Sequence, residues 1–349
     1  MHPQFGELMA EATALTRAGD LQAAMTAITA ALAGGPATSP PPQAPAPDVV
    51  DVIARVVDEP APTAATGPTA AAESAQFLAG HYAHRAGKRD YRLFVPAPQG
   101  DKPRALVLML HGCTQNPEDF ARGTRMNALG AAHNALVLYP AQGRQANAQG
   151  CWNWFKHNHQ GRGRGEPALL ADLTRHIAQT HGVDPARVYV AGLSAGGAMA
   201  AILATTHPDV FAAAGVHSGL PAGAARDLPG ALAAMQGQGG SGAAGAPRSA
   251  VRMIVLHGDA DTTVHPGNGD RVAAAHGATA VHVDEQTCLH GNRSCTRRVH
   301  RDAQGRVVTE QWRVHGAGHA WSGGDPAGSY TDARGPDASA EMMRFFVQD

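Results

Sequence analysis

The stretch VYVAGLSAGG, residues 188–197, decides how this chain folds. An apolar run typical of a buried strand leads into a G-x-S-x-G turn, and small residues suited to a helix follow it. A serine on such a turn has its hydroxyl pushed out of the backbone, where a base can reach it. Gly192 and Gly196 flank Ser194 because side chains there would collide with the neighbouring strand or helix. The sequence therefore predicts that Ser194 is a nucleophile.

Strand-like and helix-like segments alternate on both sides of this turn. Apolar runs predict strands at residues 89–95, 105–110, 135–139, 188–191, 212–217 and 253–256. The spacing of leucines predicts a helix over 168–180, packed on the sheet. Strands that alternate with helices form a mostly parallel sheet, with chemistry-bearing loops at the strand carboxyl ends. We expect an α/β-hydrolase fold, a mostly parallel central sheet flanked by helices.

A serine nucleophile needs a histidine to take its proton, and the histidine needs an acid to orient it. In this fold the acid follows the serine along the chain and the histidine comes last. The strand ending at residue 256 leads into Asp259 and Asp261, and both qualify as the acid. Asp259 suits a turn residue that bonds its own backbone. We favour Asp261.

The histidine is expected on a loop after the last strand. Residues 296–301 and 307–314 read as a hairpin, which delivers His315 and His319 among glycines. We favour His319 as the base, with His315 as the weaker candidate. A metal site formed by His315 and His319 is not favoured. The glycines around them argue against a helix, and no H-E-x-x-H pattern is present. We expect no metal and no cofactor.

The oxyanion hole needs two backbone amides at the developing negative charge. One should belong to Ala195, the residue after the nucleophile, and the other to the loop HGCTQ at residues 111–115. Cys113 is the expected donor in that loop. Its alternative role is packing or pairing of the thiol.

The segment CWNWF, residues 151–155, is the densest aromatic cluster in a chain with few aromatic residues. Trp152 and Trp154 in it, and Trp321 beside the proposed base, suit a shallow apolar substrate-binding site. Core packing is the alternative for all three indoles.

The chain divides by composition into three parts. Residues 1–33 predict an N-terminal helical hairpin, either a cap on the main domain, which we favour, or a docking element. Residues 34–75 are rich in proline and alanine and predict a flexible linker, and the catalytic domain then spans 76–349. Residues 237–247 predict a surface loop, with a mobile loop over the site as the alternative.

Charge and cysteine content restrict the partners and the compartment. The formal net charge of −1 suggests no nucleic-acid partner, and no apolar run approaches the roughly 18 residues of a membrane span. No export signal is visible, so we expect a cytoplasmic protein with reduced thiols. The four cysteines nevertheless allow three disulfide pairings. The sequence indicates no oligomeric state.

These motifs together resemble the esterase family of short-chain poly(3-hydroxybutyrate) depolymerases. The resemblance covers the main domain and rests on residues 111–116, 123–127, 151–155, 192–197, 257–264, 318–321 and 335–339. It implies a triad of Ser194, Asp261 and His319, an oxyanion loop at Cys113, and disulfides Cys113–Cys151 and Cys288–Cys295.

The resemblance also implies the reaction. We expect a serine carboxylesterase that hydrolyses 3-hydroxyalkanoate polyesters or oligomers through an acyl-enzyme. Secreted members of the family have a signal peptide and a polymer-binding domain. We expect neither in this protein, so amorphous granules or soluble oligomers fit better as substrate than crystalline polymer. An extracellular enzyme is the alternative. A feruloyl or acetyl-xylan esterase is the rival enzyme, and a non-catalytic granule-binding or adaptor protein is the rival of another class.

Overall fold

The computed structural model describes residues 74–348 apart from 101–102, 239–250 and 291. The predicted helical hairpin and nearly all of the predicted linker lie outside the described residues. So does most of the loop predicted at 237–247. Among the described helices, none combines the length and the apolar character that crossing a bilayer requires.

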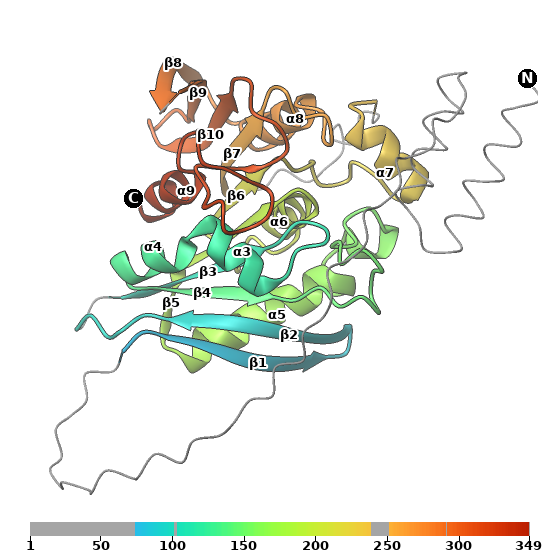
Figure 1. Cartoon of the computed structure of the whole chain (residues 1–349), viewed down its shortest axis with the longest axis vertical. Coiled ribbons are helices and arrows are strands. Elements are labelled where there is room, and N and C mark those ends of the chain that lie inside the picture. Colours follow the sequence, from blue (N-terminus) through green and yellow to red (C-terminus); the bar gives the residue numbers. More distant parts are fainter. Residues whose placement is uncertain (1–73, 101–102, 239–250, 291, 349) are drawn as a thin grey trace, which may run out of the picture. The chain divides into compact units, whose positions relative to one another are not determined.

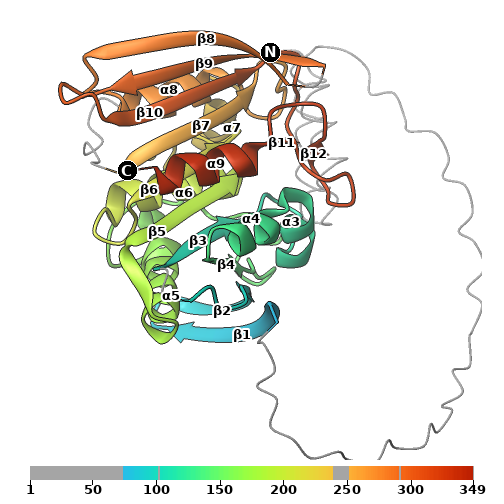
Figure 2. The ribbon, with the colours of Figure 1, turned by 90° about the vertical axis from the view of Figure 1, so that its left-hand side faces the viewer.

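A ten-stranded sheet forms the centre of the described part, in the order β1-β2-β4-β3-β5-β6-β7-β10-β9-β8 (Figures 1 and 2). The six strands from β4 to β10 in that order run parallel, and antiparallel pairs extend the sheet at both edges. The strands are β1 (Gln76–His84), β2 (Gly87–Val95), β3 (Arg104–Leu110), β4 (Ala135–Pro140), β5 (Val183–Leu193), β6 (Ala213–His217), β7 (Arg252–Gly258), β8 (His282–His290), β9 (Arg293–Arg301) and β10 (Val307–Val314). Two short strands, β11 (Trp321–Ser322) and β12 (Thr331–Asp332), form a separate parallel pair.

Helices cover both faces of the sheet. Side chains of α5 (Gly165–Thr180), α6 (Ala195–Thr206), α7 (Leu228–Met235) and α8 (Gly267–His276) belong to one buried cluster. Those of α3 (Pro117–Thr124), α4 (Met126–Ala132) and α9 (Ala338–Val347) belong to the other. Strand β3 contributes side chains to both clusters, because its alternate residues face opposite sides of the sheet. This arrangement is the predicted α/β-hydrolase fold.

The predicted strands and the predicted helix over 168–180 are present, with small shifts at their ends. The edge strands β1 and β8 were not predicted. Both are largely exposed and mix polar with apolar residues, so neither has the continuous apolar run of a buried strand. Their pairing with β2 and β9 is what makes them strands.

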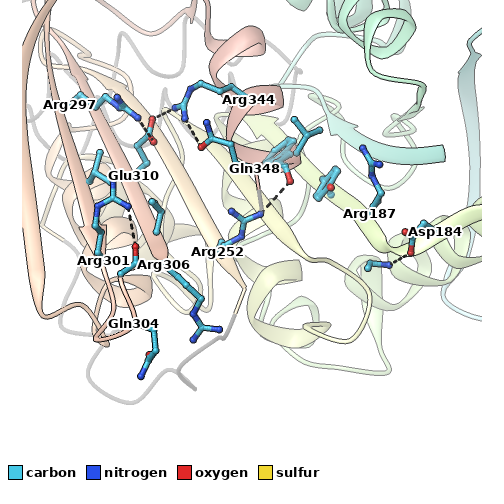
Figure 3. A pocket seen from close by; sticks show the side chains of 17 residues that line it. Asp184, Arg187, Arg252, Arg297, Arg301, Gln304, Arg306, Glu310, Arg344 and Gln348 are labelled. Carbon is cyan, nitrogen blue, oxygen red and sulfur yellow. Dashed lines mark hydrogen bonds and ion pairs between the residues drawn. The ribbon is translucent and has the colours of Figure 1, made fainter. Parts of the chain in front are cut away.

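A hollow of about 1000 Å³ lies at the amino ends of β5, β7 and β10, lined by six arginines (Figure 3). Buried Glu310 bonds both Arg297 and Arg344 there. The residues with predicted chemistry follow the opposite, carboxyl ends of the same three strands. The hollow and the candidate site are therefore separated by the length of the strands, roughly 20 Å for a strand of six residues.

Candidate active site

Strand β5 ends at Leu193 and helix α6 begins at Ala195, so Ser194 forms the turn between them. Its backbone has φ 57° and ψ −119°, a conformation that L-residues rarely adopt. A Cβ on Gly196 would lie 2.0 Å from the carbonyl oxygen of Leu110, and one on Gly192 would lie 2.4 Å from Gly196. The two glycines thus leave room for the tight turn that presents the serine side chain.

The two acid candidates and the two histidine candidates form two separate pairs. His319 Nδ1 lies 2.7 Å from Asp261 Oδ2, and His315 Nδ1 lies 2.7 Å from Asp259 Oδ2. The Asp261 side chain is 0% exposed and that of His319 12%, whereas Asp259 and His315 are about one-third exposed. Burial therefore distinguishes the favoured pair from the alternative.

Several donors fix the carboxylate of Asp261. Its Oδ1 accepts the backbone amides of Thr263 and Val264, both at 2.9 Å. His257 Nε2 lies 3.3 Å from Oδ2 while bonding the carbonyl of Val264 at 2.9 Å. Burial raises the pKa of Asp261, but hydrogen bonds from His257 and His319 outweigh it and hold the pKa well below its usual range. Asp261 therefore stays ionised and keeps the proton of His319 on Nδ1.

The loop after β7, residues 259–266, is here called the acid loop, and the loop after β10, residues 315–320, the histidine loop. Backbone hydrogen bonds join the two loops. The amide of Asp259 donates to the carbonyl of Val314 at 3.1 Å, and the amide of Ala260 donates to that of Ala317 at 3.0 Å. A Cβ on Gly258 would lie 2.2 Å from the same Ala317 oxygen. Only glycine lets the two loops approach this closely.

The loop after β3 lies against the serine turn, since a Cβ on Gly112 would be 3.7 Å from Ser194 Cβ. The amide of Gly112 donates to Gln115 Oε1 at 2.9 Å, and that of Thr114 donates to the carbonyl of Gln149 at 2.8 Å. Within the described residues, the intervening amide of Cys113 has no acceptor. At Ala195 the helix begins, where amides lack intrahelical acceptors. Both proposed oxyanion donors are thus available beside the turn.

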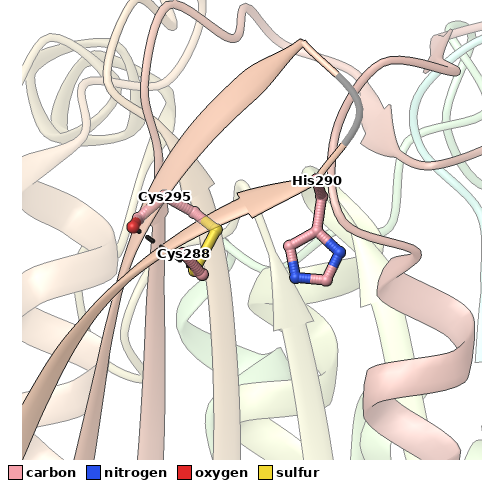
Figure 4. Close-up of side chains that lie close together, drawn as sticks. All are labelled: Cys288, His290 and Cys295. Atoms are coloured by element: carbon pink, nitrogen blue, oxygen red, sulfur yellow. Dashed lines mark hydrogen bonds between the residues drawn. A yellow bond between two sulfur atoms is a disulfide. The ribbon is translucent and has the colours of Figure 1, made fainter.

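Two disulfides join the four cysteines, as the resemblance implied and contrary to the expectation of reduced thiols. Cys113–Cys151 anchors the loop after β3. Cys288–Cys295 links paired residues of β8 and β9, with His290 close by (Figure 4).

The tryptophans require a correction, because all three lie in the core rather than on an open cleft. Trp152 is 0% exposed, Trp154 5% and Trp321 1%. Trp152 Nε1 donates to the carbonyl of His111 at 3.1 Å, under the loop after β3. The burial of their rings excludes these residues from an open substrate-binding surface and supports the packing alternative.

Other sequence motifs meet behind the histidine loop. Arg125 Nη2 donates to the carbonyl of Gly323 at 2.8 Å and bonds Asp337, which caps α9. Trp321 Nε1 donates to Ser339 Oγ at 3.0 Å, and this hydroxyl donates to the carbonyl of Thr124. These contacts hold the loop after His319 against α3 and α9.

Sequence reasoning did not assign a role to His217, the last residue of β6. It is 1% exposed and its ring stacks on Trp321. The available signal was its position, a polar residue where an apolar strand ends on the edge that carries the other candidates.

The sequence is also similar to those of known proteins. Residues 89–295 match the family model described as "Esterase PHB depolymerase". The chain is 31% identical over 244 residues to poly(3-hydroxyalkanoate) depolymerase C of Paucimonas lemoignei, covering 65% of this chain and 58% of that protein. It is 30% identical over 280 residues to a poly(3-hydroxybutyrate) depolymerase of Ralstonia pickettii, covering 73% and 56%. The chain thus spans somewhat more than half the length of these relatives.

Among solved structures, an acetyl xylan esterase from Aspergillus awamori matches with a TM-score of 0.60 and 20% identity. The match covers 78% of this chain and 99% of that one. At this identity the likeness concerns the fold alone.

Proposed function

The chain belongs to the PHB depolymerase esterase family, and on that premise we propose that it is a serine carboxylesterase acting on poly(3-hydroxybutyrate) or related short-chain 3-hydroxyalkanoate polyesters and oligomers. The observation that supports the proposal best is the buried pair of Asp261 and His319, on loops that follow the same sheet edge as Ser194. The substrate class comes from the names of the two depolymerase relatives.

The reaction begins when Ser194 Oγ attacks the ester carbonyl carbon and His319 Nε2 takes its proton. Nε2 is the acceptor because Nδ1 donates to Asp261. The amides of Cys113 and Ala195 bind the oxyanion of the tetrahedral intermediate. His319 then protonates the leaving alcohol, and the acyl group stays on Ser194.

Deacylation repeats these steps with water as the nucleophile and Ser194 as the leaving group. His319 takes a proton from water, the hydroxide attacks the acyl-enzyme, and the proton returns to Ser194 as the hydroxy acid leaves. Asp261 stabilises the imidazolium in both halves without taking its proton. Buried Asp261 is suited to this because its pKa is held low.

A substrate panel tests the proposal. Wild type and Ser194→Ala would be given hydroxybutyrate oligomers, amorphous polymer granules, acetylated xylan and a feruloyl ester, with identification of the acid released. We expect release of 3-hydroxybutyrate by the wild type and by the matched control Ser294→Ala, at an exposed serine on β9, but not by Ser194→Ala. Full hydrolysis by Ser194→Ala would refute the mechanism, and release of only acetate or ferulate would refute the substrate class.

The compartment is part of the proposal. The cytoplasm and an oxidising compartment are the two candidates, and two disulfides are typical of the oxidising one. Thiol alkylation in intact producing cells, followed by mass measurement, separates the two: cysteines that become alkylated support the cytoplasm, and blocked cysteines support export.

A further inference from the structure

His217 contacts both the serine turn and the segment after His319, the proposed base. The backbone amide of Ser194 donates to the carbonyl of His217 at 2.9 Å. The backbone amide of Ser322 donates to the side chain of the same residue, at Nε2, at 3.0 Å. We propose that His217 is a positioning residue that holds the nucleophile and the histidine loop in register. The inference rests on the proposed function, in which Ser194 and His319 react together.

The side-chain bond acts close to the base. Ser322 lies three residues after His319, and the amide of the intervening Ala320 donates to the carbonyl of Gly318 at 3.0 Å. A tightly turned segment of this length transmits a displacement of Ser322 to the imidazole. Misplacement of a reacting group by about 1 Å can cost about 10²-fold in rate.

Packing fixes the imidazole of His217. Its ring stacks on Trp321 with centroids 5.1 Å apart and an interplanar angle of 26°. Trp321 is itself held through Ser339 and through its amide, which donates to the carbonyl of Tyr330 at 2.7 Å. The ring of His217 therefore has little freedom to turn away from Ser322.

The hydrogen bonds also define the tautomer of His217. Because Nε2 accepts the amide of Ser322, it carries no proton, and the proton of the neutral ring sits on Nδ1, 3.2 Å from Ser218 Oγ. Complete burial agrees with a neutral ring, since it lowers the pKa of His217. A permanent acceptor is what the loop amide requires.

Two substitutions distinguish the hydrogen-bond acceptor of His217 from the volume of its ring. His217→Gln retains an acceptor near the position of Nε2, whereas His217→Met fills similar volume without one. We expect His217→Met to lower kcat by about 10²-fold with KM within about twofold, and His217→Gln to stay within about tenfold of wild type on a short p-nitrophenyl ester. His276→Met, at a buried histidine on α8, is the control for generic loss of a core imidazole.

Wild-type kcat in a folded His217→Met would overturn the inference, and so would equal losses in the Met and Gln variants. Should the Met variant not fold, ¹⁵N chemical shifts of the wild-type imidazole give a second test, since a proton on Nε2 contradicts the bond to Ser322. Ser194→Ala is measured on the same ester. Hydrolysis that persists in it refutes the proposed function, whereas its loss together with normal His217→Met refutes only the positioning role.

Discussion

His319 Nδ1 donates a 2.7 Å hydrogen bond to Asp261 Oδ2, and the aspartate side chain is fully buried. The nearby pair of His315 and Asp259 has the same separation but lies at the surface. Two histidine–aspartate pairs of equal separation thus differ in their access to solvent, and the buried one can stabilise an imidazolium with less competition from water.

This difference predicts that replacing the two aspartates has unequal effects. Asp261→Asn should lower kcat by about 10³–10⁴-fold, because the amide no longer holds the proton of His319 on Nδ1. Asp259→Asn should leave kcat within about threefold, since its partner His315 bonds Thr296 on β9 rather than the serine turn. Steady-state hydrolysis of a p-nitrophenyl ester measures both. Equal losses in the two variants would contradict the assignment.

Buried histidines predict acid sensitivity of the fold. Burial lowers the pKa of His217 to about 3 and the pKa values of His207 and His276 to about 4. Between about pH 4 and the unfolded value of about 6.5, the unfolded chain binds protons that the folded chain does not. The free energy of unfolding should therefore fall as pH falls through this window, by about 1.4 kcal/mol per pH unit for each histidine.

Urea unfolding at about pH 7 and about pH 5 checks this expectation. His276→Gln should flatten the dependence, and replacement of exposed His282 by glutamine is its control. An unfolding free energy that is the same at both pH values would disprove the account.

The two disulfides should differ in their effect on activity. Removing Cys113–Cys151 with a double alanine variant should lower kcat by about tenfold or more, because the loop after β3 loses its anchor while the amide at 113 remains. Removing Cys288–Cys295 should leave kcat unchanged, since that bond lies in the β8–β9 hairpin. Sequence separations of 38 and 7 residues predict stability losses of roughly 4 and 2 kcal/mol. Kinetics and urea unfolding of both double variants test the contrast.

A buried ion pair supports the segment next to Cys151. Arg89 Nη2 lies 2.9 Å from Glu166 Oε1, and Glu166 Oε2 accepts the amide of Asn153 at 2.7 Å. Arg89→Met should destabilise the protein by up to about 3–5 kcal/mol, because it removes the guanidinium from buried Glu166. The carboxylate is then left with His159 at 3.4 Å and the amides of Asn153. Arg92→Met breaks a half-exposed pair with Glu118 and should cost less than about 1 kcal/mol. Similar losses of unfolding free energy in the two variants would count against this reading.

The parts of the site that lie close together in sequence were predictable. The serine turn needs an apolar strand, two glycines and a helix, and all of them fall within residues 188–206. The candidates for the acid and the base could be narrowed to two residues each, because loops at the carboxyl ends of β7 and β10 were expected to meet. Asp261 and His319 were the favoured residues, and these are the two that the structure places in the buried pair.

The tryptophans show where sequence reasoning leaves a choice open. An indole suits both an apolar cleft and a core, and only the packing of neighbouring elements determines which of the two it enters. The sequence analysis missed His217 for a related reason. Its proposed role depends on Ser322, which lies more than a hundred residues away in sequence. Similarly, the cysteine count allowed several pairings, and only the paired strands and loops bring particular sulfurs together.

The sequence by itself determined the fold class and the serine turn, because apolar runs and glycines act through sterics over a few residues. Only the tertiary structure decided which aspartate meets which histidine, which rings are buried and which residue joins the serine turn to the histidine loop. Those outcomes depend on distances and on exclusion of water, and both arise only when strands far apart in the chain lie side by side.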